Sequence, residues 1–118
     1  MILCNWKVSW LLWESKMDKE VRKTEIYRIL KNLYFLAEKD DWEKYFKIKE
    51  IYNNLIINIF GSKFKHGDEA WDWDNARNGL DMLYTLKRLR GKEKYEEEKK
   101  NQIVKALERI EKLKKYLT

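Results

Sequence analysis

Residues that interrupt regular structure are nearly absent from this 118-residue sequence, which has no proline and only four glycines. Proteins rich in β-strands need frequent turns, and glycine and proline supply many of them, so their scarcity argues against a strand-rich fold. The abundant residues are lysine, glutamate, leucine and isoleucine, most of which lose little conformational freedom in a helix. The composition therefore predicts an all-α protein.

Cysteine and histidine are equally scarce, because Cys4 and His66 are the single examples of each. A lone cysteine cannot form an internal disulfide, and the paired Cys and His spacings that hold zinc are missing. The sequence also has no glycine-rich phosphate-binding loop and no nucleophile signature beside His66. We expect no catalytic residue, no metal site and no cofactor, and a reducing, cytoplasmic setting.

Long apolar runs are missing as well, since no stretch approaches the roughly 18 apolar residues that a membrane-spanning helix requires. Residues 1–16 lack the basic leader and the small-residue cleavage site of an export signal. Met17 offers an alternative start, in which case residues 1–16 would be an upstream extension. We expect a protein without a membrane span.

The residues that are present suffice for a folded core. Hydrophobic residues make up 44% of the chain, enough to offset conformational entropy even though 39% of the residues are charged. The length fits one helical domain, residues 1–118, with a Trp-rich N-terminal segment at 1–14 and a helical bundle at 15–118. The net charge of +6 arises from 26 basic and 20 acidic residues, which gives a mild preference for polyanions.

Apolar residues recur at every third or fourth position in four segments, the spacing of the buried face of an amphipathic helix. The first helix should begin at Ser15, which forms a capping pattern with Asp18, and end near Lys39. Most connections between the segments are short, which implies antiparallel neighbours. The sequence therefore predicts an antiparallel four-helix bundle with an additional Trp-rich N-terminal segment, either a short helix or an arm.

The second helix is predicted to begin at the capping pair Asp40 and Glu43 and to reach Phe60, where Gly61 supplies a left-handed closing residue. Its last turns are apolar nearly all round, which is typical of a helix enclosed by its neighbours. After a loop at 61–67, Asp68 is placed to cap the third helix.

The third segment allows two interpretations. Asn78-Gly79 is a strong hairpin signal and is flanked by alternating apolar residues, whereas an internal glycine costs a helix only ~1 kcal/mol. A lone hairpin is marginal without a sheet to join, so we expect a helix that runs toward Gly91. The last helix, 92–117, opens with KEKYEEEKKNQ, which lacks an apolar face. We expect its second half to pack and its first turns to face solvent or a partner.

Three tryptophans near the start also allow alternatives. On a helix, Trp6, Trp10 and Trp13 would share one side, because they are spaced by four and three. The first interpretation is burial against the bundle, since large aromatic side chains are usually core. The second is a binding surface for a partner protein or a second copy, and the third is adsorption to a membrane surface. Of these, we expect burial, with partner binding as the main alternative.

The clearest functional candidate is LKRLRGK, residues 86–92, where Lys87, Arg88, Arg90 and Lys92 occur without an acid. An antiparallel bundle would bring Lys39 to the same end. The opposite end would gather a second group of cations, consisting of Lys63, Lys65, His66, Lys112, Lys114 and Lys115. Such groups attract phosphates, and nearby rings can stack on unpaired bases, although cations also favour helix C-termini because of the helix dipole.

We therefore expect a small, basic, non-catalytic protein that contacts the backbone of nucleic acid as a subunit or regulator of a nucleoprotein assembly. One alternative is a protein–protein interaction module or inhibitor, acting as a homo-oligomer or with a partner through the Trp-rich segment or the last helix. Another is a Mg²⁺-dependent nucleotide hydrolase, because Glu38/Asp41 and Glu69/Asp72 resemble the paired acids of helical nucleotide pyrophosphatases. Acids at a helix start are also expected from the helix dipole alone.

Overall fold

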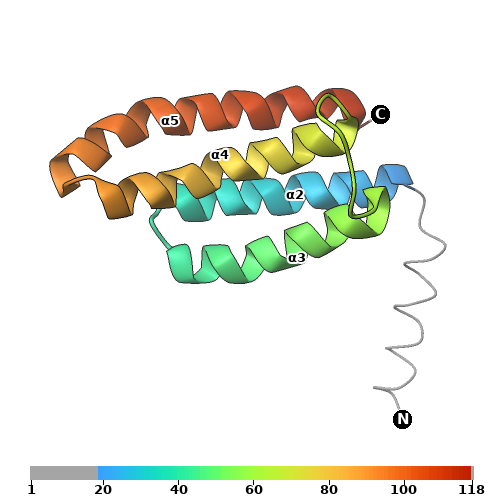
Figure 1. Ribbon diagram of the computed structural model, residues 1–118, viewed down its shortest axis with the longest axis horizontal. Coiled ribbons are helices and arrows are strands. Elements are labelled where there is room, and N and C mark those ends of the chain that lie inside the picture. Colours follow the sequence, from blue (N-terminus) through green and yellow to red (C-terminus); the bar gives the residue numbers. More distant parts are fainter. Residues whose placement is uncertain (1–18, 118) are drawn as a thin grey trace, which may run out of the picture.

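The computed structural model describes residues 19–117, which form four α-helices and one short 3-10 helix. Successive helices run in opposite directions along the molecule (Figure 1), so the predicted all-α helical bundle is confirmed. The elements in chain order are α2 (Lys19–Glu38), α3 (Trp42–Phe60), α4 (Glu69–Leu89), α5 (Lys92–Lys112) and η1 (Leu113–Tyr116).

Two expectations concern the first part of the chain. Trp6, Trp10 and Trp13 lie outside the described residues, so burial and partner binding both stay predictions for them. The predicted helix start at Ser15 and Asp18 also lies outside the described residues. Within residues 19–117, no helix combines the length and the apolar character that crossing a membrane would require.

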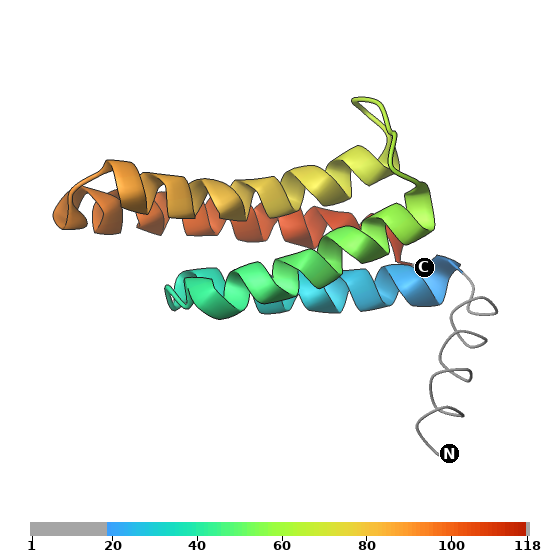
Figure 2. The ribbon, with the colours of Figure 1, turned by 60° about the horizontal axis from the view of Figure 1, so that its bottom comes forward.

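The core lies where all four helices meet. Helices α2 and α4 each pack against the other three, whereas α3 and α5 lie on opposite sides of that pair, as Figures 1 and 2 show. Apolar side chains from all four helices fill this core, and their burial away from water is the main force that holds the helices together. The largest fully buried side chains are Trp73, Tyr45, Tyr52, Ile26, Leu30, Leu33, Leu80, Leu83 and Ile110.

The turn between α2 and α3 differs from its prediction in one residue. Asp41, and not Asp40, is the N-cap of α3, and its carboxylate accepts a hydrogen bond from the backbone N–H of Lys44 at 3.4 Å. Asp40 instead has a positive φ of 61°, which aspartate tolerates better than most residues. This backbone conformation reverses the chain within three residues, and it frees the Asp40 carboxylate to contact another helix.

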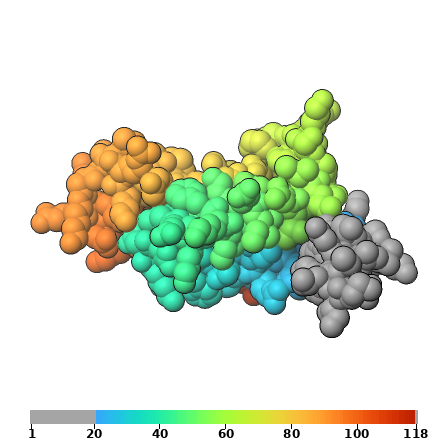
Figure 3. Space-filling view, turned by 90° about the horizontal axis from the view of Figure 1, so that it is seen from below, coloured from blue at the N-terminus to red at the C-terminus, as the bar shows by residue number. Residues whose placement is uncertain are grey.

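The connection between α3 and α4 is the longest in the described chain. Gly61 has a φ of 86° and follows the last residue of α3, as predicted. The loop that follows projects away from the helices beside the start of α4 (Figures 2 and 3). Asp68 is the N-cap residue of α4, but its carboxylate accepts the backbone N–H of Lys65 at 2.8 Å and does not cap the helix. The carboxylate therefore stabilises the loop.

Helix α4 continues through Asn78 and Gly79, so the helical interpretation is confirmed and the hairpin is wrong. The physical reason is burial, because Ala76, Leu80 and Leu83 are spaced for one helical face and all three are buried. Gly79 lies against α5, where a Cβ added to it would be 2.7 Å from Nη1 of Arg109. The glycine therefore lets a guanidinium lie close to the backbone of α4.

The expectation that the first turns of α5 have no packing role is wrong at one residue. Tyr95, at the end of the first turn, is 3% exposed, whereas its neighbours Lys94 and Glu96 are exposed. In the second half, Ala106 and Ile110 are buried as predicted. A single aromatic residue in a charged sequence therefore packs the start of α5 against the bundle.

The glycine at position 79 gives the first prediction. Gly79→Ala should raise the free energy of unfolding by about 0.5–1 kcal/mol, because alanine restricts the unfolded chain and favours the helix. The new methyl group would meet the guanidinium of Arg109, which is the flexible end of a side chain and can move. Urea unfolding followed by circular dichroism measures the change. A loss of stability would show instead that Arg109 is held rigidly against α4.

Candidate nucleic-acid interface

The structure brings the predicted basic residues to one end of the bundle, where α4 ends and α5 begins. Lys87, Arg88, Arg90 and Lys92 are all exposed, and they surround the short connection at 90–91. Lys39 follows the last residue of α2 at the same end and is also exposed, as predicted. This connection extends beyond α3, as the orange atoms of Figure 3 show. We call these five residues the basic end.

The same region also contains acids that the segment 86–92 does not reveal. Glu93, Glu96 and Glu97 are exposed on the first turns of α5, and Arg90 lies 3.8 Å from the carboxylate of Glu98. Opposite charges this close reduce the positive potential that a distant phosphate would experience. The basic end therefore carries charges of both signs, because the turn at Gly91 places the acidic start of α5 beside the basic end of α4.

An aromatic cluster joins α3 to α4 near this end. The rings of Phe46 and Tyr84 meet edge to face, with centroids 4.9 Å apart and planes at 88°. Behind them lie Trp42 and Tyr45, both buried, whose ring centroids are 4.9 Å apart. The Arg88 guanidinium lies 5.9 Å from the centre of the Tyr84 ring, close enough for a cation–π interaction.

A polar network beside this cluster is centred on Asp81 of α4. The Tyr45 hydroxyl donates to Oδ1 of Asp81 at 2.5 Å, and Lys49 and Arg77 both form ion pairs with Oδ2. Arg77 also pairs with Asp74 at 2.7 Å. Burial and the Asp81 carboxylate both raise the pKa of Tyr45, so it remains a hydrogen-bond donor at neutral pH. The network fixes α3 against α4 where the two helices have no short connection.

A second polar contact attaches the start of α5 to the α2–α3 turn. The Asp40 carboxylate accepts hydrogen bonds from the Tyr95 hydroxyl at 2.6 Å, from Lys99 at 2.8 Å and from the Trp42 indole at 3.1 Å. Partial burial acts to raise the pKa of Asp40, but these hydrogen bonds outweigh it and lower the pKa below the usual 3.8. The contact brings residues 55 and 59 positions apart in sequence into one cluster.

A groove between α4 and α5 lies at the opposite end of the bundle. It encloses a cavity of about 130 Å³, and three cations from α5 and η1, Arg109, Lys112 and Lys115, contribute to its wall. Asp72, Asn75, Ala76 and Leu113 complete the lining. Within residues 19–117, none of these three cations forms an ion pair with a carboxylate. Their charges are therefore available to an anion from solution.

The acids in and beside this groove, Asp72 and Glu111, accept hydrogen bonds from other side chains. Hydrogen bonds from Lys114 and Lys31 lower the pKa of Glu111 to about 2 and hold that carboxylate on the α2 side of α5. Asp72 accepts a hydrogen bond from the Tyr116 hydroxyl, which raises the pKa of Tyr116 to about 12. The sequence predicts Lys112 and Lys115 among several cations at this end but does not indicate a groove. Arg109 was missed, because its role depends on its position beside Gly79.

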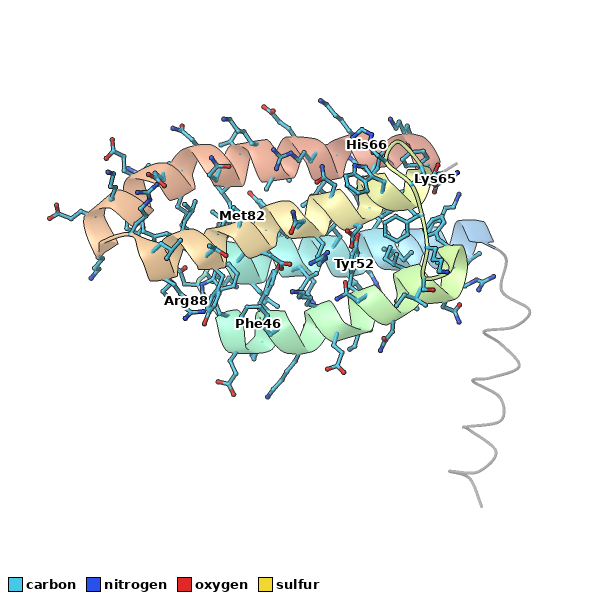
Figure 4. All side chains as sticks on the ribbon, in the orientation of Figure 1. Phe46, Tyr52, Lys65, His66, Met82 and Arg88 are labelled. Atoms are coloured by element: carbon cyan, nitrogen blue, oxygen red, sulfur yellow. The ribbon has the colours of Figure 1, made fainter. Side chains whose placement is uncertain are left out.

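The remaining predicted cations of this end lie in the loop before α4. Lys63 and Lys65 are exposed, and His66 lies with its ring centroid 4.9 Å from that of Trp71 (Figure 4). Lys114 differs from the others because it pairs with Glu111 at 2.6 Å. The structure therefore divides the second predicted group into a loop part, a groove part and one neutralised lysine.

The four acids suggested for a magnesium site do not meet. Glu38 and Asp41 lie where α2 ends, whereas Glu69 and Asp72 lie at the start of α4, at the opposite end of the bundle (Figure 1). Glu69 pairs with Lys23 and also accepts a hydrogen bond from the Trp73 indole. In the part of the chain that the structure describes, no three Asp, Glu, His or Cys side chains are grouped as metal ligands would be. The pairing of these four carboxylates in one site is therefore wrong.

Comparison of the chain with protein-family models, curated proteins and solved structures finds no match. The groove offers cations without acidic partners, and the basic end offers mixed charge beside partly exposed aromatic rings. Both are features of proteins that bind phosphates and bases.

The Asp40 contact gives the second prediction. Asp40→Asn should lower the free energy of unfolding at pH 7 by about 1–2 kcal/mol, because hydrogen bonds to a charged group are stronger than those to a neutral amide. Asparagine tolerates the positive φ at this position, so the substitution tests the side chain and not the backbone. Urea unfolding at several pH values measures the effect.

The stability difference between the parent protein and Asp40→Asn should depend on pH, in a direction set by the lowered pKa of Asp40. The folded-state pKa of Asp40 is lowered, so its stabilisation is complete above the unfolded value near 3.8 and is lost as pH falls through the folded value. The difference between the parent protein and Asp40→Asn should therefore shrink in acid. Asp41→Asn is the matched control and should be nearly neutral, since asparagine is an equally good N-cap. Equal losses for both variants would contradict the assigned role of Asp40.

Proposed function

We propose that this protein is a non-enzymatic binding protein that contacts the phosphate backbone of nucleic acid, as a subunit or regulator of a nucleoprotein assembly. The contact surface is a row of four cations along one side of α5 and η1, which we call the α5 stripe. Its members are spaced by four, three and three residues, so they follow one side of the helix and are all exposed. They are Lys105, Arg109, Lys112 and Lys115.

The observation that carries this proposal is the charge balance of the groove. Three cations line one cavity, and among residues 19–117 no carboxylate forms an ion pair with them. The single acid in the wall, Asp72, accepts a hydrogen bond from Tyr116. A phosphate that enters the groove would meet several donors at once, and each contact would release counterions from the nucleic acid. Backbone binding of this kind does not depend on base sequence.

The helix dipole accounts for only part of the α5 stripe. Cations are stabilised near the C-terminus of a helix, but the effect falls off within the last turn. Arg109 and Lys112 both lie within the last turn of α5, whereas Lys105 precedes Lys112 by nearly two turns. Arg109 also lies against Gly79 of the neighbouring helix, which the dipole does not explain. The stripe is therefore longer than helix stability alone requires.

The basic end predicted from the sequence has a secondary role in this proposal. Lys39, Lys87, Arg88 and Lys92 are exposed and, within the described chain, unpaired with acids. The glutamates at the start of α5 lower the net field there, so these cations should add less affinity than the stripe. They lie at the other end of α4, where a bound strand that leaves the groove along this helix would reach them.

The third prediction compares the two surfaces. Lys105→Glu/Lys112→Glu should weaken binding of a labelled single-stranded oligonucleotide, and Arg88→Glu/Arg90→Glu should weaken it less. Both variants change the net charge by the same amount, so a difference in affinity between them must arise from where the substituted residues lie. On a single strand each phosphate contact contributes roughly 0.7 to the slope of log affinity against log salt. The slope should therefore become less steep by about 1.4 or more in the first variant.

Lys44→Glu/Lys47→Glu is the matched control for charge. Both lysines are exposed on α3, the helix on the opposite side of the α2–α4 pair from α5, and the substitutions change the net charge equally. This control should retain most of the affinity of the parent protein. Equal weakening of all three variants would mean that only net charge matters, and the site assignment would be wrong. Absence of binding to any nucleic acid at low salt would refute the proposed function.

A further inference from the structure

We propose that Phe46 and Tyr84, flanked by Lys49 and Arg88, form a shelf that stacks on an unpaired base, so that the ligand is a single strand. We call these four residues the aromatic shelf. The inference rests on the proposed function and deepens it by naming the class of nucleic acid. The α5 stripe supplies contacts to the backbone, and the aromatic shelf supplies the preference for bases that are not paired.

The shelf has the exposure and geometry that stacking requires. Phe46 is 38% exposed although its ring contacts Tyr45, Tyr84 and Trp42. Those neighbours meet it edge to face or tilted, so the ring is supported from the protein side and part of it stays open to solvent. Stacking on an aromatic ring tolerates any base, because every base has a π face. This agrees with backbone binding that is independent of sequence.

The rings are held in place before any ligand binds. Tyr45 and Lys49 are both attached to Asp81, which places the Lys49 ammonium 5.5 Å from the centre of the Phe46 ring. Trp42 is 6% exposed and supports Tyr84 with a centroid distance of 5.3 Å. A surface that is ordered in advance loses less entropy on binding than a flexible one. The polar network at Asp81 therefore orders the aromatic shelf and also holds α3 against α4.

Charge distinguishes Phe46 from another exposed phenylalanine. Phe35 on α2 is 48% exposed, and its ring also lies near a lysine, Lys31, at 6.0 Å. That lysine forms an ion pair with Glu111 at 2.9 Å. Lys49 at Phe46 is paired in the same way, with Asp81 at 3.0 Å. The difference is Arg88, which lies over Tyr84, the ring that meets Phe46 edge to face. Arg88 contacts a ring and, within residues 19–117, no acid. A phosphate attached to a stacked base would therefore find an unpaired cation beside the aromatic shelf.

The exposed side of α4 connects the shelf to the groove. Asn75 lines the groove, and Arg88 lies thirteen residues later on the same helix, which corresponds to about 20 Å at 1.5 Å per residue. Asn78, Met82 and Thr85 are exposed between them. Figure 4 shows Met82 on α4 between His66 near one end and Arg88 near the other. A strand of a few nucleotides can therefore contact both sites, whereas a duplex keeps its bases stacked inside and cannot use the shelf.

The fourth prediction compares two oligomers of equal length, one an ordinary single-stranded DNA and the other an abasic deoxyribose-phosphate chain. The parent protein should bind the abasic chain more weakly, because it offers phosphates but no bases. Phe46→Leu should lower affinity for the ordinary strand roughly tenfold and leave the abasic chain within about twofold, given the usual value of one stacked base. Leucine preserves apolar packing, so circular dichroism should show an unchanged fold.

Two further variants make the outcome decisive. Phe46→Tyr keeps an aromatic ring and should retain binding to the ordinary strand. Phe35→Leu is the matched control and should have no effect on either oligomer. Equal binding of the two oligomers by the parent protein, or an unchanged affinity of Phe46→Leu, would overturn the aromatic shelf and leave backbone binding intact. If the parent protein binds neither oligomer, the proposed function itself fails.

Discussion

The contact between α3 and α4 through Asp81 is the constraint on which the rest of the structure depends. These two helices are joined by the longest loop of the described chain, so the connection does not fix their distance or register. Tyr45, Lys49 and Arg77 all reach the same carboxylate, and Tyr52 donates to the backbone carbonyl of Trp73. A partly buried carboxylate that lacked these partners would be costly, so other registers of the two helices are disfavoured. The same register brings Phe46 and Tyr84 together.

Charge is distributed in this bundle so that polar contacts fix the fold and leave particular cations free. Asp40, Asp81 and Glu111 each accept from two or more donors and connect residues that are distant in sequence. Lys23, Lys31, Lys49 and Lys99 are used in these or similar pairs. The cations of the α5 stripe and of the basic end are largely excluded from such pairs. A modest net charge of +6 therefore leaves the groove locally more positive than the total suggests.

Helix order and the core could be predicted from the sequence because both depend on periodicity. Leu30, Leu33, Ile56 and Ile110 are buried as their spacing indicates, and α4 continues through Asn78-Gly79 because its neighbours on the buried face outweigh the turn signal. The details that depend on distant contacts could not be predicted. Asp40 accepts hydrogen bonds from α5, Tyr95 is buried in a charged segment, and Arg109 lines a groove that exists only when α4 and α5 pack. The basic segment 86–92 and the acids that follow it were both visible, but the approach of Glu98 to Arg90 across the turn was not.

The central claim is that a single strand lies along the exposed side of α4 between the groove and the aromatic shelf. The most direct measurement is a titration of the ¹⁵N-labelled protein with a short single-stranded oligonucleotide, followed by amide chemical shifts. The account predicts shifts at the exposed positions of α4, in the second half of α5 with η1 and in the region of Phe46, with smaller shifts at the basic end. Shifts on the outer sides of α2 and α3, with α4 and α5 unchanged, would contradict it.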